Sequence, residues 1–224
     1  MYPLQVEPAG LGLIETLRVR EGRMPFLDRH LARLSRSLAE LGLPSPEDDP
    51  AALLRAHADS GDAVVRLEVC GGRASVTVRP VPAVAPPRVI TVTVPHEGYR
   101  HKTTARGMFE QAGAEAWAAG ADEALLLTRG RLVAEATVWS VYWWEDDVLR
   151  TPALGLRILP GVARSRIGEL ATVVEGWWPR DALAGRSVFL ANAVRGIVEV
   201  AELDREPVPS EWRTAELAER FWSV

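Results

Sequence analysis

The 224-residue sequence predicts an α+β protein built from two domains. Short apolar or alternating segments, typical of β-strands, outnumber the amphipathic segments that predict helices. A stretch from Arg79 to Arg88 contains four prolines and has the composition of a linker. We therefore place the domain boundary there, with a small α+β domain over residues 1–82 and a larger domain over residues 83–224.

The first domain is expected to combine two helices with a mostly antiparallel sheet. The longer helix spans residues 28–41, because leucines recur on one face, Asp28 is a good N-cap and Gly42 can end it. The other helix begins near Pro50. A turn at Gly71-Gly72 joins the last two strands. The expected elements in order are a strand at 12–20, helices at 28–41 and 49–58, and strands at 63–70 and 74–79.

The second domain reads mainly as short strands joined by tight turns, with two helices between them. Turn residues such as Arg129-Gly130 and Glu145-Asp146-Asp147 separate segments of strand length. The expected elements in order are a strand at 89–94, a helix after Thr104 that ends near Ala119, strands at 123–128, 132–136, 138–144 and 148–151, a helix at 161–170, and strands at 172–174, 187–191 and 197–200.

Composition excludes several classes of function. The net charge is -4 and no dense basic run occurs, so we expect no nucleic-acid partner. The single Cys70 cannot form an intrachain disulfide and fits a reducing cytoplasm. Residues 1–10 lack the pattern of a signal peptide, and no apolar stretch is long enough to span a membrane. We expect a cytoplasmic protein with no membrane partner and no bound metal.

The basic residues are distributed unevenly between the two types. Of 26 lysines and arginines, 25 are arginine, and Lys102 is the single lysine. Codon usage explains the scarcity of lysine but does not explain why one remains. Arginine cannot lose its proton in a protein, whereas a lysine amine can lose it and attack a carbonyl carbon. Lys102 is therefore a candidate nucleophile.

A series of motifs in the second half of the chain, together with Lys102, carries a resemblance to a known family. The motifs are His101-Lys102-Thr103-Thr104-Ala105-Arg106, Ala121 to Leu127, Leu132 to Thr137, Thr151-Pro152, and Leu159-Pro160-Gly161-Val162-Ala163-Arg164. In this order and at these spacings they resemble the fold-type IV pyridoxal-phosphate enzymes, the class IV aminotransferase family. That family includes branched-chain and D-amino-acid aminotransferases and aminodeoxychorismate lyase. The resemblance runs from about Gly12 to Val200.

The resemblance implies a fold, a cofactor and an assembly. The fold is a smaller N-terminal α/β sandwich followed by a larger C-terminal mixed β domain with helices, which carries the cofactor lysine. The cofactor is pyridoxal 5'-phosphate, the substrate is a small amino or keto acid, and the assembly is a homodimer.

The same resemblance implies roles for individual residues. Lys102 matches the lysine that holds the cofactor as a Schiff base. Glu135 matches the carboxylate that faces the pyridine nitrogen and keeps it protonated. Arg33 matches the arginine that binds the phosphate, since a guanidinium pairs with phosphate through two parallel hydrogen bonds. Arg29 and Arg36 lie on the same predicted helix and are alternatives for that role.

Two further turns match the family's phosphate-binding segments. Val162 and Ala163 should begin a helix, whose first N–H groups can bind phosphate. Asn192 and Ala193 match a second phosphate-side turn. The threonines common in both segments are absent, so we expect phosphate binding to depend on backbone amides and Arg33.

The expected activity is that of 4-amino-4-deoxychorismate lyase, an enzyme of folate biosynthesis that releases pyruvate and yields 4-aminobenzoate. Arg106 resembles the lyase, and Gly107 stands where aminotransferases usually carry a tyrosine. Arg73, in a hairpin turn, is a second candidate for substrate contact. An amino-acid aminotransferase of branched-chain or D-amino-acid type is the alternative. A cofactor-binding protein with little turnover is a third possibility, indicated by the absent threonines and by the few residues that precede Gly12.

Overall fold

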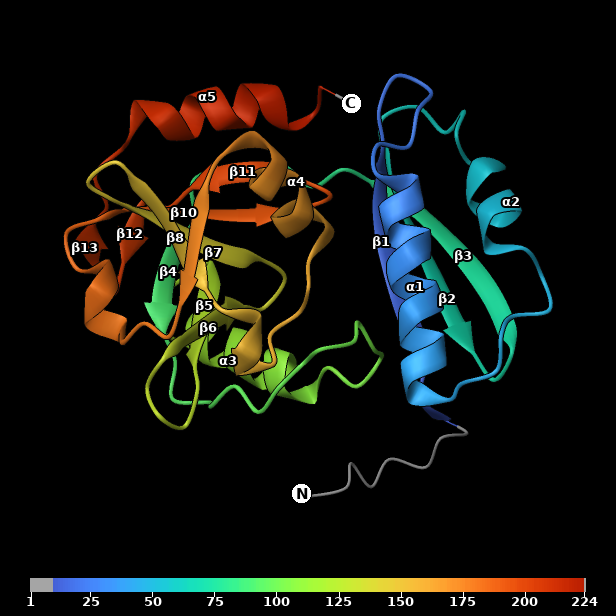
Figure 1. The fold of residues 1–224 in the computed structure, drawn as a ribbon, viewed down its shortest axis with the longest axis horizontal. Helices are drawn as coiled ribbons and strands as arrows, with labels where there is room; N and C mark the ends of the chain where they lie inside the picture. Colours follow the sequence, from blue (N-terminus) through green and yellow to red (C-terminus); the bar gives the residue numbers. More distant parts are fainter. Residues whose placement is uncertain (1–9, 224) are drawn as a thin grey trace. The chain divides into compact units, whose positions relative to one another are not determined.

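The computed structural model describes residues 10–223, which form two compact units (Figure 1). Unit 1 contains the described residues up to Pro82 together with His101–Ala105, and unit 2 contains Ala83–Arg100 and the chain from Arg106 onward. The segment around Lys102 belongs to unit 1, whereas we expected it in the C-terminal domain. Residues 1–9, where we expected no signal peptide, lie outside the described residues.

Unit 1 is a three-stranded antiparallel sheet with helices packed on it, in the strand order β1-β2-β3. Helix α1 contacts β1, and α2 contacts β2 and β3. These elements lie within one or two residues of the predicted ones except at the end of α2. Their bounds are β1 Leu13–Val19, α1 Leu27–Leu41, α2 Pro50–Arg55, β2 Ala63–Cys70 and β3 Arg73–Pro80.

The core of unit 1 follows from the residue pattern. Alternate residues of β1, including Leu13 and Leu17, pack against Leu34 and Leu38 of α1. Helix α1 begins differently from the prediction: Asp28 lies in the first turn, and the N-cap is Phe26, with a left-handed φ of 66° and no side-chain cap. An acidic residue in the first turn still stabilises the helix through its dipole.

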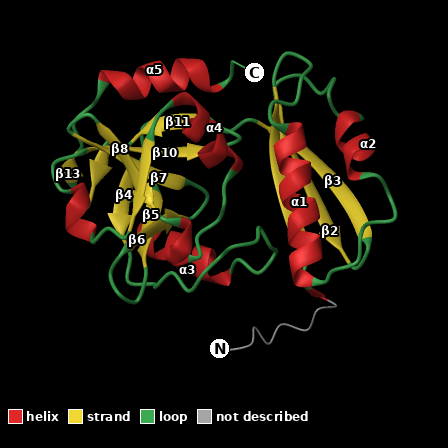
Figure 2. Ribbon diagram, in the orientation of Figure 1, coloured by secondary structure: helices red, strands yellow, loops and turns green. Residues whose placement is uncertain are grey.

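Unit 2 consists of two five-stranded sheets with strand orders β11-β10-β7-β8-β9 and β13-β12-β4-β5-β6 (Figure 2). Most pairs are antiparallel, but β4 pairs in parallel with β5 and β12, and β8 with β9. The strands are β4 Arg88–Thr91, β5 Glu123–Leu127, β6 Val133–Ala136, β7 Ser140–Glu145, β8 Val148–Pro152, β9 Val173–Gly176, β10 Ser187–Asn192, β11 Gly196–Glu199, β12 Glu202–Leu203 and β13 Glu206–Pro207. The helices are α3 Gly107–Ala118, α4 Val162–Leu170 and α5 Trp212–Phe221, with 3-10 turns η2 Leu154–Leu156 and η3 Arg180–Leu183.

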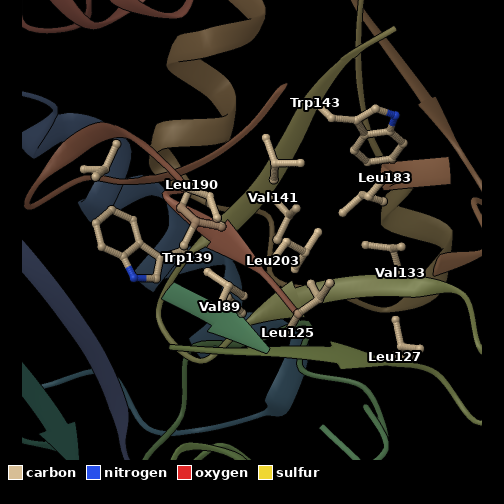
Figure 3. Close-up of a cluster of buried hydrophobic side chains, with 14 residues drawn as sticks. Val89, Leu125, Leu127, Val133, Trp139, Val141, Trp143, Leu183, Leu190 and Leu203 are labelled. Atoms are coloured by element: carbon tan, nitrogen blue, oxygen red, sulfur yellow. The ribbon is translucent and has the colours of Figure 1, made fainter. Parts of the chain in front are cut away.

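The core of unit 2 is formed by residues from both sheets (Figure 3). Leu125 and Val133 from one sheet and Val141 and Leu190 from the other belong to one buried cluster. Trp143 is fully buried in that cluster, so its indole fills the core. Helix α5 and strands β12 and β13 were not predicted. The two strands have two residues each, too few to show an alternating pattern.

The mixture of helices and sheets confirms the predicted α+β class. No helix among residues 10–223 combines the length and the apolar character needed to cross a membrane.

Candidate active site

The candidate residues fall into two sets, one in each unit, and each set is described by itself. Lys102, Arg33 and Arg73 belong to unit 1. The set in unit 2 comprises Glu135, Val162, Ala163, Asn192, Ala193 and Arg106.

The backbone around Lys102 is hydrogen-bonded to the free edge of β1. The Ile14 N–H donates to the Lys102 carbonyl at 2.7 Å, and the Thr104 N–H donates to the Gly12 carbonyl at 2.9 Å. The Gly12 N–H donates in turn to Thr104 Oγ1 at 3.0 Å. A Cβ at Gly12 would lie 2.9 Å from the Thr104 side chain, so a glycine is needed for this close approach. The lysine segment is therefore a short extension of the unit 1 sheet, which is why it packs with that unit.

His101 attaches the same segment to α1. Its Nδ1 lies 3.1 Å from Ser37 Oγ, and its Nε2 lies 3.6 Å from a Glu40 carboxylate oxygen. Ser37 is buried, and Lys102 itself is half-buried. The main chain on both sides of Lys102 is thus fixed by β1 and α1. Our sequence analysis gave His101 no role.

A buried charged cluster made of Glu15, His30 and Arg33 lies between β1 and α1. Glu15 Oε1 accepts a hydrogen bond from Arg33 Nε at 2.9 Å, and Glu15 Oε2 lies 2.5 Å from Arg33 Nη2. Glu15 Oε2 also lies 2.6 Å from His30 Nδ1. All three residues are buried. The Nε–Nη2 edge of Arg33, which we expected to bind phosphate through two parallel hydrogen bonds, is therefore paired with Glu15. Nη1 is the nitrogen of this guanidinium that Glu15 does not contact.

The charges of this cluster follow from its surroundings. Burial alone would raise the pKa of Glu15, but the Arg33 charge and the hydrogen bonds from His30 and Arg33 outweigh it and lower that pKa to about 2. Burial lowers the pKa of His30, the hydrogen bond and charge of Glu15 oppose this in part, and the charges of Arg33 and Lys102 add to the lowering. At neutral pH the cluster holds an anionic Glu15, a cationic Arg33 and a neutral His30.

We expect acid to destabilise the protein in two overlapping ranges. A neutral His30 in the folded state loses stabilisation as the pH falls below 6.5, where the unfolded side chain takes up a proton. Glu15 contributes its full stabilisation of the fold above its ordinary pKa of 4.5. That contribution is lost as the pH falls from 4.5 to about 2. Over this second range the free energy of unfolding falls by about 3 kcal/mol. Urea unfolding from pH 8 down to about pH 2 measures both losses, and a Glu15→Gln variant with an unchanged slope below pH 4.5 would contradict the assignment.

Arg73 takes no part in these contacts. It is exposed and begins β3 directly after Gly71 and Gly72, both of which have positive φ. It belongs neither to the Glu15 cluster nor to the hydrogen bonds around Lys102.

In unit 2, Glu135 lies on β6 beside a β-bulge. Leu127 of β5 pairs with Val133, and Leu125 pairs with Ala136, so β6 holds one residue more than its partner in this interval. A bulge redirects the side chains next to it. Glu135 is 5% exposed, His96 Nε2 lies 2.8 Å from its Oε1, and the Leu159 N–H points at Oε1 (3.3 Å) and Oε2 (3.4 Å).

The segment that begins at Leu159 leads directly into α4. Its N-cap is Gly161, which is extended and makes no side-chain cap, and Val162 and Ala163 form the buried start of the helix. The first amides of a helix have no acceptor within it. Arg164 is buried and donates to Thr151 Oγ1 at 3.1 Å and to the Pro152 carbonyl at 2.7 Å. The motif Thr151-Pro152 and the motif that ends at Arg164 therefore contact each other, and this contact fixes the start of α4 on β8.

The second predicted phosphate turn is closed by its own asparagine. Asn192 Oδ1 accepts from the N–H groups of Val194 at 3.0 Å and Arg195 at 2.8 Å. The Asn192 amide also donates to the Val138 carbonyl at 3.3 Å. This side chain shapes the turn that contains Ala193, so a ligand there would meet the backbone of the turn.

Arg106 is held by groups of its own unit. Its Nη2 donates to the Thr137 carbonyl at 2.8 Å, and its Nη1 lies 3.4 Å from the Tyr99 hydroxyl. The guanidinium carbon lies 4.8 Å from the centre of the Phe109 ring. These contacts give Arg106 a structural role around the start of α3.

Comparison with known proteins places the chain in a family. The sequence model described as "Amino-transferase class IV" matches residues 12–203. The chain belongs to the class IV aminotransferase family. Members of this family are pyridoxal-phosphate-dependent enzymes that act on small amino and keto acids.

Solved structures share the fold of this member of the class IV aminotransferase family. A candidate amino-acid aminotransferase from Mesorhizobium loti is 30% identical, with a TM-score of 0.79 over 86% of this chain and 99% of that one. A candidate 4-amino-4-deoxychorismate lyase from Legionella pneumophila is 22% identical, with a TM-score of 0.81 over 99% of this chain and 96% of that one. A hypothetical aminotransferase from Mycobacterium tuberculosis, solved with pyridoxal phosphate bound, is 23% identical, with a TM-score of 0.85 over 94% and 88%. No curated protein sequence matches the chain.

The residues of this member of the class IV aminotransferase family fit the chemistry of the cofactor. The aldehyde needs an amine, and Lys102 is the one lysine of the chain. The pyridine nitrogen needs an anion, and Glu135 is a buried carboxylate whose described donors are the imidazole of His96 and the backbone amide of Leu159. The phosphate needs cations or amide donors. Nη1 of Arg33 belongs to a cation, and the first residues of α4 carry backbone amide donors.

Sequence reasoning missed three buried polar residues of this family member. Glu15 had a usable signal, because it is an acid on the inward face of a strand whose other inward residues are Leu13, Leu17 and Val19. His30 lies three residues before Arg33 and therefore on the same helix face. No sequence pattern indicated His96, because the segment before Lys102 in which it lies is irregular.

Proposed function

We propose that the chain binds pyridoxal phosphate on Lys102 and catalyses the release of pyruvate from 4-amino-4-deoxychorismate. The observation that carries the cofactor part is the single lysine, whose main chain is hydrogen-bonded to β1 through Ile14 and Gly12. A reactive amine must be held in one place, and backbone hydrogen bonds on both sides of the residue do this.

Each candidate residue has a task in this proposal. The Lys102 amine would hold the cofactor, and the same amine would accept the proton from the substrate α-carbon. When bound, pyridoxal phosphate supplies a sink for the negative charge that develops at that carbon. Glu135 holds a proton on the ring nitrogen. Arg33, through Nη1, and the amides of Val162 and Ala163 bind the phosphate, with the backbone at Asn192-Ala193 as a further donor.

The choice of the lyase reaction is supported by Gly107. Aminotransferases of the family usually carry a tyrosine there, and a Cβ added to Gly107 would meet no atom within 4 Å. A Cβ at this position is thus unobstructed, so close packing at the Cβ does not explain the glycine, and the absence of the tyrosine suits a chemistry that does not need it. The contribution of Arg106 is weaker than the sequence indicated, because its guanidinium is bound to Thr137 and the α3 region.

An amino-acid aminotransferase is the second candidate, and one observation favours it. The 30% identical structure, which the chain matches over 99% of that protein, is described as a candidate amino-acid aminotransferase. This reaction uses the same Lys102, Glu135 and Arg33, so the residues described above do not separate the two activities.

The first experiment is reduction of the protein with borohydride in the presence of pyridoxal phosphate, followed by peptide mapping. We expect an absorbance band at roughly 410–430 nm, and a pyridoxyl label on the peptide that contains Lys102. Lys102→Arg, which keeps the charge but cannot attach the aldehyde, is the matched control and should carry no label. An unlabelled wild-type protein would reject the proposal and favour the alternative of a protein with little turnover.

Substrate assays then separate the two reactions. Pyruvate released from 4-amino-4-deoxychorismate without a keto-acid acceptor supports the lyase. Amino transfer from branched-chain or D-amino acids to a keto acid, without pyruvate release, supports the aminotransferase instead.

We also propose a cytoplasmic location and a homodimeric assembly. The single cysteine supports the first and the family resemblance supports the second. Cell fractionation and light scattering of the purified protein would test them.

A further inference from the structure

His96 is the polar side chain closest to the carboxylate of Glu135. Its Nε2 lies 2.8 Å from Glu135 Oε1, and its side chain is fully buried. Its backbone N–H donates to the Leu127 carbonyl at 2.7 Å, which places it in register with the end of β5. The Phe109 ring lies against it, with ring centres 6.2 Å apart. The imidazole is thus fixed by the sheet and by α3.

The hydrogen bond indicates which nitrogen of His96 acts on Glu135. A carboxylate oxygen accepts, so Nε2–H of His96 is the donor to Oε1. Nδ1 is buried and has no hydrogen-bond partner among residues 10–223. Nε2 is therefore the atom through which His96 holds the carboxylate.

The two oxygens of Glu135 are occupied unequally. Oε1 accepts from His96 at 2.8 Å and faces the Leu159 N–H at 3.3 Å. Within residues 10–223, Oε2 has a single long contact, 3.4 Å from the Leu159 N–H. Oε2 therefore keeps its capacity to accept another hydrogen bond.

We propose that His96 is a positioning residue, which holds Glu135 by Oε1 so that Oε2 accepts the hydrogen bond from the ring nitrogen of the cofactor. A donor on Oε1 alone suits this task, because it orients the carboxylate and leaves Oε2 able to accept from the ring nitrogen. This inference rests on the proposed role of Glu135 and adds the residue that orients it.

The test compares the binding of pyridoxal phosphate with that of 1-deazapyridoxal phosphate, which has a C–H in place of the ring nitrogen. The dissociation constants of both cofactors are measured for the wild-type protein and for the variants His96→Gln and His96→Asn. Glutamine can place an N–H where Nε2 stands, whereas asparagine is one methylene too short. We expect the wild-type protein and His96→Gln to prefer pyridoxal phosphate, and His96→Asn to lose about 10- to 100-fold of that preference.

Each outcome has one meaning. If all three proteins prefer pyridoxal phosphate over 1-deazapyridoxal phosphate to the same extent, the role of His96 is overturned. A loss in His96→Asn that affects both cofactors alike also overturns it, because that is the mark of a purely structural role. A wild-type protein that binds both cofactors equally well instead overturns the role of Glu135. Circular dichroism checks the fold, and His96→Phe, which fills the volume without a donor, replaces the asparagine variant if that one does not fold.

Discussion

Lys102→Ala is expected to lower turnover by at least about 10³-fold while leaving the free energy of unfolding within about 0.5 kcal/mol of the wild type. The amine has two tasks in the proposed reaction, attachment of the cofactor and transfer of the α-proton, and alanine can do neither. The fold should persist because backbone hydrogen bonds attach this segment to β1 whatever side chain residue 102 carries. The Lys102 carbonyl still accepts from Ile14, and Thr104 still pairs with Gly12.

Steady-state kinetics with saturating pyridoxal phosphate, together with urea unfolding, measure both parts of this expectation. A small primary amine added to Lys102→Ala should restore part of the proton transfer, and the same amine should have no effect on the wild-type rate. Normal turnover in Lys102→Ala would show that the single lysine is not the catalytic base. A large loss of stability would show that its side chain serves the fold.

Glu15→Gln is expected to lower the free energy of unfolding by about 3–5 kcal/mol. Glu15 is the buried anion that balances Arg33, and it also accepts the hydrogen bond from His30. Removing its charge leaves the guanidinium buried between β1 and α1 without a counter-charge. The penalty is much larger than for a pair at the surface because water cannot replace the lost partner.

The pair Arg18–Asp62 is a matched control on the same sheet. Its atoms are 2.7 Å apart, but the Asp62 side chain is 55% exposed. Asp62→Asn should cost less than about 1 kcal/mol. The double variant Glu15→Gln, Arg33→Gln should recover part of the loss, since it removes both charges. If Glu15→Gln were as mild as Asp62→Asn, the cluster would not be a main source of stability in unit 1.

Much of the local structure could be predicted because it depends on neighbouring residues. The leucine spacing that predicted α1 is the spacing that packs Leu34 and Leu38 against β1. Gly42 ends that helix with a left-handed φ of 63°, as a glycine in that position predicts. Helix α5 was missed, although Thr214, Leu217 and Phe221 share its buried face. A face with so few large apolar residues gives a weak periodic signal.

The partners of the candidate residues could not be predicted, because they come from distant parts of the chain. Arg33 was expected to present its fork to a phosphate, and the structure pairs that fork with Glu15, 18 residues earlier. His96 reaches Glu135 across 39 residues. The bulge that redirects β6 depends on how β6 pairs with β5. A sequence pattern records which residue types occur, but not which strand will lie beside which.

By itself the sequence determined the α+β class, most of the strands and helices, and the choice of Lys102, since a lone amine among arginines is a chemical fact that needs no structure. The tertiary structure decided that the Lys102 segment extends the sheet of unit 1, that Arg33 is neutralised by Glu15, and that Arg106 supports α3. The physical reason is the same in each case. A buried polar group must find a partner when water is removed, and that partner is known only once the chain has folded.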